Sequence, residues 1–164
     1  MYSVNKSLLV TCIAIGLITN SIMVKQSIFF YDFDQCEEGK IVNKEIEFKN
    51  NKNLEENIQY TLQSLFDNDD ELNSFIPFGV KITNILYING SLEIQISRNI
   101  LNYGGTATED ALVNQILATV FDFEEINEFT LFIEDNDDLL VEGTSINKYT
   151  RNDWEERMKT IEEN

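Results

Sequence analysis

Residues 76–97 read IPFGVKITNILYINGSLEIQIS, and this stretch decides the fold. At its centre lies Asn89-Gly90, a dipeptide that accepts the positive φ angles of a type I′ turn, so the sequence predicts a two-residue β-hairpin. After the turn, apolar and polar side chains alternate, which is typical of a strand with one buried face. Before the turn, we expect the apolar residues of one parity to face the core: Val80, Ile82, Leu86 and Ile88.

The chain that follows the hairpin predicts a helix and a closing strand. Gly104-Gly105 interrupts the strand pattern, and residues 106–109 (TATE) have the sequence of a capping box, which favours a helix start. Residues 129–133 (FTLFI) predict the last strand. Between them, apolar residues recur at the spacing of a helix face: Leu112, Val113, Ile116, Leu117, Val120 and Phe121.

Three further elements are predicted upstream of residue 76. Residues 27–33 and 41–48 have the apolar and aromatic content of strands, and Asn53 is a suitable N-cap for a helix over residues 54–66. The resulting order is β-β-α-β-β-α-β. This order predicts an α+β fold, with a mixed or antiparallel sheet that carries two helices on one face.

This pattern resembles the GerMN domain family, known from sporulation and spore germination proteins. The family pattern has an Ile/Leu-Pro-x-Gly phrase before the hairpin, which residues 76–79 match, and residues 97–105 (SRNILNYGG) and 117–123 (LATVFDF) are similar to two later phrases. The resemblance covers residues 27–143. It implies an assembly module similar to the ring-building domains of sporulation envelope complexes. It names no catalytic residue, and the matched turn residues are fold-forming: Pro77, Gly79, Asn89, Gly90, Gly104 and Gly105.

An apolar segment over residues 8–24 predicts an N-terminal transmembrane helix, within an anchor region of residues 1–25. The acids that follow it favour an extracytoplasmic domain and a single-pass protein of the cell membrane. Three alternatives remain open: a cleavable signal peptide, a lipoprotein anchored through Cys12, and a buried core helix. Cys36, the second cysteine, is interpreted as a free thiol, with an intermolecular disulfide as the alternative.

The composition limits the functions that this chain can have. A net charge of −17 makes nucleic acid a poor partner, because acidic domains repel phosphate backbones. The absence of histidine excludes Ser-His and Cys-His nucleophiles and argues against most zinc sites. The acidic run at residues 67–71 begins like a calcium loop but lacks the Gly and the Glu that such a loop needs, and residues 135–138 are interpreted as a tight acidic turn. Both runs are interpreted as solvated loops, with a Ca²⁺ site as the alternative. We therefore expect no catalytic site, metal or cofactor.

Residues 144–164 form a tail in which a short amphipathic helix is predicted. Trp154, Met158 and Ile161 lie at i, i+4 and i+7, so they share one helix face. Two interpretations follow: the helix docks onto its own domain, or this stripe contacts a partner protein.

Two functions remain open from the sequence. The first is a non-catalytic structural or assembly role in sporulation or germination, with a protein partner in the cell envelope or self-association into a ring. The second is an extracytoplasmic module that binds cell-wall glycan or peptide through exposed aromatic residues such as Tyr87, Tyr103 and Tyr149. Clustering of these aromatic residues in one groove would favour the second function.

Overall fold

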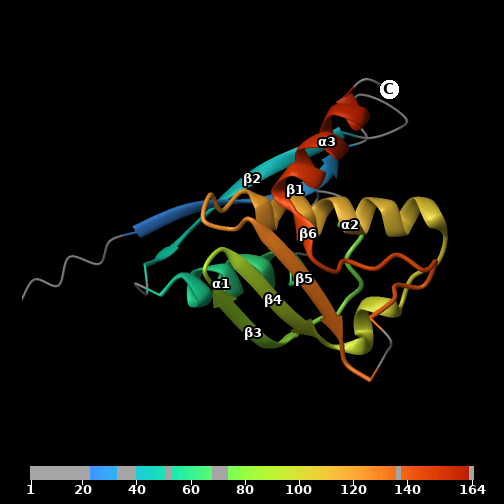
Figure 1. Ribbon diagram of the computed structural model, residues 1–164, viewed down its shortest axis with the longest axis horizontal. Helices are drawn as coiled ribbons and strands as arrows, with labels where there is room; N and C mark the ends of the chain where they lie inside the picture. Colours follow the sequence, from blue (N-terminus) through green and yellow to red (C-terminus); the bar gives the residue numbers. More distant parts are fainter. Residues whose placement is uncertain (1–22, 33–39, 51–52, 68–73, 136–137, 163–164) are drawn as a thin grey trace, which may run out of the picture.

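The computed structural model describes residues 23–32, 40–50, 53–67, 74–135 and 138–162. These residues form three layers (Figure 1): a two-stranded ribbon, a layer of helices and a four-stranded sheet. The ribbon packs on α1 and α2, and one continuous core joins all three layers. The expected α+β class is present, but the expected single sheet is wrong, because the two N-terminal strands pair only with each other.

The ribbon consists of β1 (Met23–Asp32) and β2 (Lys40–Lys49), paired antiparallel along their whole length. Ile28, Phe30 and Phe48 are its most deeply buried side chains. The second edge of β1 is held by α2, because the Phe29 N–H donates to Thr119 Oγ1 at 3.2 Å and Gln115 Nε2 donates to the Phe29 carbonyl at 3.2 Å. Side-chain hydrogen bonds thus replace a third strand at this edge.

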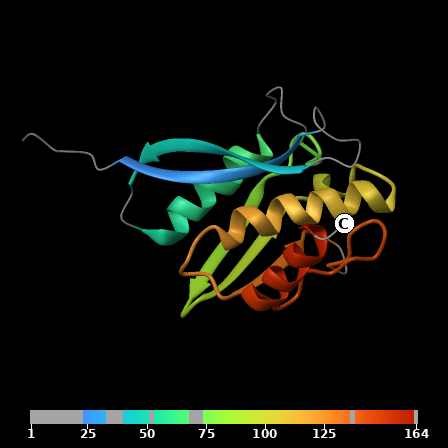
Figure 2. The ribbon, with the colours of Figure 1, turned by 90° about the horizontal axis from the view of Figure 1, so that it is seen from above.

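The helices α1 (Leu54–Phe66) and α2 (Thr106–Phe121) lie between the ribbon and the sheet. Asn53 caps α1 as expected, since its Oδ1 accepts a hydrogen bond from the Glu55 N–H at 3.0 Å. Every residue of α2 from 111 to 121 is buried, polar ones included. Figure 2 shows why this helix has no solvent face there: the ribbon covers one side, and α3 (Arg151–Glu162) runs alongside.

The four-stranded sheet has the order β3-β4-β5-β6. It is mixed, because β4 (Ser91–Ile96) pairs antiparallel with β3 (Ile82–Ile88) and parallel with β5 (Glu128–Ile133). The short strand β6 (Tyr149–Thr150) was not expected from the sequence. A 3₁₀ helix, η1 (Arg98–Leu101), follows β4, and α2 then connects β4 to β5.

The hairpin between β3 and β4 has the predicted turn, with φ of 50° at Asn89 and 89° at Gly90. The predicted facing of β3 is only partly right. A bulge lies between Ile82 and Asn84, where the pairing with β4 shifts by one residue. Because a bulge changes which face the following side chains occupy, Leu86 points to solvent rather than to the core.

The expected capping box at residues 106–109 is absent. The structure instead places Gly105 at the N-cap, with φ of 93° and no side-chain cap. Glu109 is buried rather than exposed at the helix start. The C-terminal helix predicted within residues 144–164 is present as α3.

The N-terminal anchor falls largely outside the described residues. Of the apolar segment over residues 8–24, only Met23 and Val24 are described, and both belong to β1 rather than to a helix. The strand therefore begins four residues before the expected start at Ser27. Within the described ranges, the structure contains no helix with the length and hydrophobicity needed to cross a bilayer.

Candidate interaction surface

The outer face of β3, β4 and β5 carries both apolar and acidic side chains that are exposed to solvent. The strand register places its residues in rows across the sheet. One row is Asn84, Gln95 and Phe132, and the next is Leu86, Glu93 and Thr130, of which Thr130 is buried. In contrast, the opposite face of β4 is fully buried, with Leu92, Ile94 and Ile96 at most 1% exposed.

Three large apolar side chains of this outer face are exposed to solvent. Leu86 is 42% exposed, Ile88 is 55% exposed and Phe132 is 36% exposed. The bulge before Asn84 explains the first two, because it directs Ile85 and Tyr87 toward the core and Leu86 and Ile88 away from it. Apolar side chains gathered on one surface are a feature of interaction sites.

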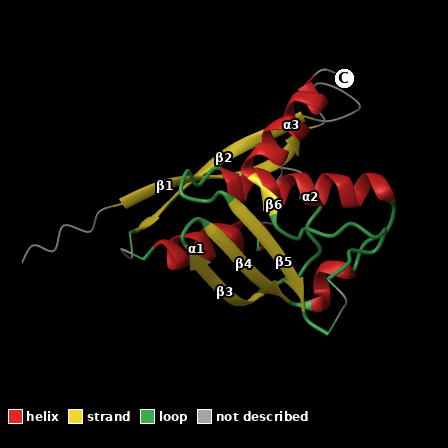
Figure 3. Ribbon diagram, in the orientation of Figure 1, coloured by secondary structure: helices red, strands yellow, loops and turns green. Residues whose placement is uncertain are grey.

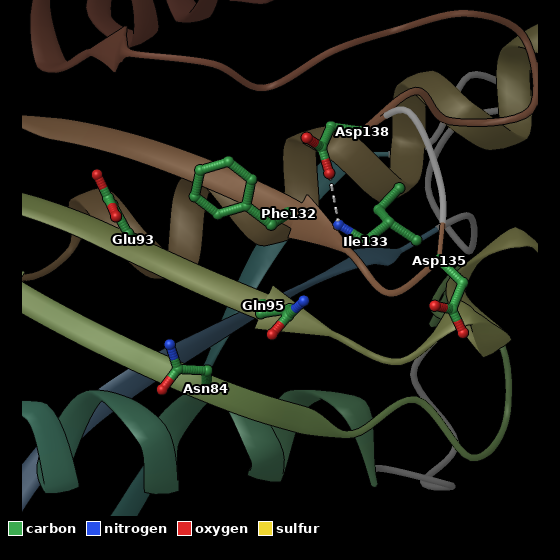
Figure 4. A pocket seen from close by; sticks show the side chains of 7 residues that line it. All are labelled: Asn84, Glu93, Gln95, Phe132, Ile133, Asp135 and Asp138. Atoms are coloured by element: carbon green, nitrogen blue, oxygen red, sulfur yellow. Dashed lines mark hydrogen bonds between the residues drawn. The ribbon is translucent and has the colours of Figure 1, made fainter.

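A shallow hollow of about 570 Å³ lies at the end of this face where β4 and β5 finish. Figure 4 shows Glu93, Gln95 and Phe132 standing on neighbouring strands, with Asp135 and Asp138 at the rim. Asp138 is held in place, because its Oδ1 accepts a hydrogen bond from the Ile133 N–H at 3.0 Å. The remaining lining residues are Asn84 and Ile133, so none of the described residues that line the hollow is basic.

The edges of the same sheet are covered by other parts of the chain. Along β3, Gln63 Oε1 accepts from the Ile82 N–H at 3.2 Å, and Glu55 Oε1 accepts from the Tyr87 N–H at 2.8 Å. Along β5, the Leu131 N–H donates to the Ile146 carbonyl at 2.8 Å. The open part of this sheet is therefore its face, not the backbone of its edges.

A second polar cluster fastens the loop between β5 and β6 to the start of α2. The path of this loop beneath α2 is visible in Figure 3. The Glu109 carboxylate, 2% exposed, accepts hydrogen bonds from the Tyr103 hydroxyl at 2.5 Å and from the N–H groups of Glu142 at 2.6 Å and Thr144 at 3.0 Å. In return, Glu142 Oε1 accepts from the Gly105 N–H at 3.0 Å. The local sequence around Glu109 predicts a helix cap and contains no signal for these contacts, because their donors lie in residues 142–144.

The ionisation of this cluster follows from its contacts. Burial alone would raise the pKa of the Glu109 carboxyl, but the hydrogen bonds from Thr144, Tyr103 and Glu142 outweigh it and lower that pKa below its usual value. Burial and the hydrogen bond to Glu109 raise the pKa of the Tyr103 hydroxyl. Glu109 is therefore a charged acceptor that joins residues 103, 142 and 144 to the start of α2.

Of the two interpretations of the stripe Trp154, Met158 and Ile161, docking onto its own domain agrees with the position of its first two residues. Trp154 is 9% exposed and belongs to the core, and Met158 packs partly buried against it. Ile161 is 37% exposed. Arg157 further holds α3 in place, donating to Asn114 Oδ1 at 2.6 Å and pairing with Asp110. Within the stripe, Trp154 is therefore covered by its own domain, whereas Ile161 stays exposed to solvent.

The aromatic residues named for a glycan-binding groove do not gather in one place. The hydroxyl of Tyr87 donates to the Glu125 carbonyl, that of Tyr103 donates to Glu109, and that of Tyr149 lies 3.5 Å from the Asp153 carbonyl. All three rings are partly buried against the core. None of them lines the hollow beside Phe132.

The expected turn residues have different conformations. Gly79, Gly90 and Gly105 have positive φ angles, whereas Gly104 does not. Pro77 precedes the turn at residues 78–79, and Asn99 Nδ2 donates to the Gly79 carbonyl at 3.0 Å.

Only parts of the acidic runs at residues 67–71 and 135–138 are described, and among the described residues no group of three or more possible metal ligands occurs.

Comparisons with known proteins agree with this architecture. A family model described as Germane, sporulation and spore germination, matches residues 27–138. A search of curated proteins finds no significant match.

Among solved structures, a protein from Clostridium perfringens described as a predicted lipoprotein superposes with a TM-score of 0.54 at 21% identity, covering 83% of this chain and 94% of that one. The first GerMN domain of the sporulation protein GerM from Bacillus subtilis gives 0.61 at 16% identity, covering 79% and 99%. The tandem GerMN domains of the same protein give 0.57 at 17%, covering 77% of this chain but 45% of that one. These likenesses establish the fold, and the family match over most of the chain shows that it belongs to the Germane family of sporulation and spore germination domains, the GerMN domains.

Proposed function

We propose that this protein is a non-catalytic interaction domain of the cell envelope that acts in sporulation or spore germination. Membership in the Germane family supports a role in sporulation or spore germination. The observation that carries the interaction role is the outward position of Leu86, Ile88 and Phe132 on an uncovered sheet face. Such a surface is expected to be covered by another macromolecule when the protein acts.

We further propose that the domain is held on the outer side of the membrane by the apolar residues that precede β1, residues 8–22. The apolar character of that segment supports this placement, and the description of the Clostridium perfringens neighbour as a predicted lipoprotein is compatible with it. Protease added to intact protoplasts tests the proposal. The domain should be degraded there, and protection until the membrane is opened would overturn it.

A heteromeric protein partner fits this chain better than a ring of identical copies. At a net charge of −17, each added copy would repel its neighbours. The glycan-binding alternative has less support, because the hydroxyls of Tyr87 and Tyr103 are bonded within the domain. A protein partner is therefore our leading candidate.

Site-specific photo-crosslinking of the full-length chain in its own sporulating host tests the interaction role. A photoreactive phenylalanine derivative replaces Asn84, which is exposed in the hollow, or Asn152, which is exposed on α3 as the matched control. We expect a protein adduct from position 84 and none from position 152. The absence of an adduct at position 84 through sporulation and germination would overturn the proposal.

A further inference from the structure

We infer that the outer face of β3, β4 and β5 binds a basic amphipathic helix of a partner protein, with its apolar side chains against Leu86 and Phe132 and its cationic ones toward Glu93. This inference rests on the proposed function and names the partner class for the same surface. Three features of the face support it: its charge, its spacing and the state of its edges.

The charge of the hollow is complementary to a cationic partner. Glu93 and Asp135 line it, and Asp138 stands at its rim with one oxygen used by the Ile133 N–H. Among the residues that the structure describes, no basic side chain lines the hollow to neutralise these carboxylates. The whole chain adds to this field, with 29 acidic against 12 basic residues. Like charges across an interface are costly, so an acidic partner segment is disfavoured here.

The spacing of the apolar groups suits a helix. Leu86 and Phe132 lie two strands apart and two residues out of register. With usual strand dimensions, their Cα atoms are about 12 Å apart. Residues seven or eight positions apart on a helix are separated by about 10–12 Å along its axis, so one helix can present an apolar side chain to each. Glu93 lies on β4, the strand between those of Leu86 and Phe132, and is paired opposite Leu86. A Lys or Arg near the middle of the bound helix would therefore reach the Glu93 carboxylate.

The hydrogen bonds at the sheet edges disfavour β-strand addition, the other common way in which a sheet binds a peptide. Adding a strand requires free backbone groups at a sheet edge. Along β3, the N–H groups of Ile82 and Tyr87 are already bonded to α1 side chains. Along β5, residues 146–150 occupy the second edge. A helix packed on the face needs no such backbone groups, so it is the occupant that this sheet accommodates.

The test combines the crosslinker at position 84 with a charge reversal in the full-length chain. Glu93→Lys reverses a charge in the hollow, and Glu155→Lys, at an exposed position of α3, makes the same change in net charge elsewhere. We expect Glu93→Lys to reduce the adduct yield at least about fivefold, because it places like charges together, and Glu155→Lys to leave it unchanged. Asp135→Asn, which suits the positive φ of 51° at that position, should give a smaller reduction.

Each outcome decides between the two proposals. An adduct whose crosslinked peptide is basic and helical, and which is lost only with Glu93→Lys, supports the inference. A protein adduct that survives Glu93→Lys, or that falls equally with Glu155→Lys, overturns the inference and leaves the interaction role standing. A lipid or glycan adduct, or none at all, overturns both. Cellular protein levels of the variants, measured in the same samples, separate lost binding from lost folding.

Discussion

Arg151 closes the C-terminal end of α2 by contacting Phe121 twice. Its guanidinium carbon lies 5.4 Å from the centre of the Phe121 ring, and Nη1 donates to the Phe121 carbonyl at 2.8 Å. Nη2 reaches the carbonyls of Phe123 at 2.6 Å and Ile126 at 2.7 Å. A cation at this end also complements the helix dipole. The first residue of α3 thus binds the C-terminal end of α2.

Replacing Arg151 with Met should destabilise the domain by about 2–4 kcal/mol, because three part-buried carbonyls would lose a charged donor. Arg151→Lys should recover less than half of this loss, since a single ammonium cannot reproduce the planar fork. Urea unfolding measures both. Lys159→Met, at an exposed position of the same helix, is the control and should change stability by less than about 0.5 kcal/mol. Equal effects at the two positions would contradict the contact.

Glu109→Ala should cost about 2–4 kcal/mol at pH 7, since it leaves the N–H groups of Glu142 and Thr144 without their acceptor. The pKa of Glu109 is lowered in the folded state, so its contribution is present at neutral pH and is lost as pH falls through that pKa. The stability gap between wild type and variant should therefore shrink below about pH 4, near the usual Glu pKa. Unfolding measured at pH 7 and pH 3 checks this, and a gap that widens in acid would contradict it.

Gly90→Ala should destabilise the fold by about 1–3 kcal/mol, because a side chain resists the positive φ of 89° there. An added Cβ would also lie 2.6 Å from Asn127 Nδ2. Gly104→Ala is the matched control: its φ is not positive and nothing lies within 4 Å of the added carbon, so it should be neutral or slightly stabilising. Thermal unfolding of both variants is the measurement. If the free energies of unfolding of the two variants differ by less than about 0.5 kcal/mol, the hairpin tolerates a different turn type at residues 89–90.

The two faces of the sheet should respond differently to the same truncation. Leu92→Ala, at a fully buried position of β4, should cost about 2–5 kcal/mol. Leu86→Ala, at the neighbouring strand but on the outer face, should cost less than about 1 kcal/mol, because its side chain is already 42% exposed. Denaturant unfolding separates the two cases. Equal costs would place Leu86 in the core and remove the proposed surface.

A fragment that begins at Met23 should fold by itself with one cooperative transition. The structure places the whole of β1 after residue 22, and Ser27 and Gln26 both hydrogen-bond Asp122 at the end of α2. A fragment that begins at residue 28 loses these contacts and should be less stable. Calorimetry of the two fragments is the test, and a Met23 fragment without a transition would show that the preceding residues are needed.

Local sequence patterns determined several elements of this protein. Asn89-Gly90 specifies its turn because few other dipeptides accept two positive φ angles. Asn53 specifies the start of α1 because its side chain reaches the Glu55 N–H within the same turn. The alternation of apolar and polar residues over positions 91–96 specified the buried face of β4. In these three cases the information lies within a few neighbouring residues.

Only the tertiary structure decided the features on which the proposed function rests. The bulge before Asn84 depends on how β3 aligns with β4, so the sequence of β3 by itself predicted the wrong face for Leu86 and Ile88. Glu109 matched a local cap, but donors from residues 142 and 144, more than thirty positions away, offered the carboxylate a better site. Trp154 lay on an amphipathic stripe, and its burial depended on where α3 meets α2. In each case the competing contacts are distant in sequence, and only the folded chain brings them together.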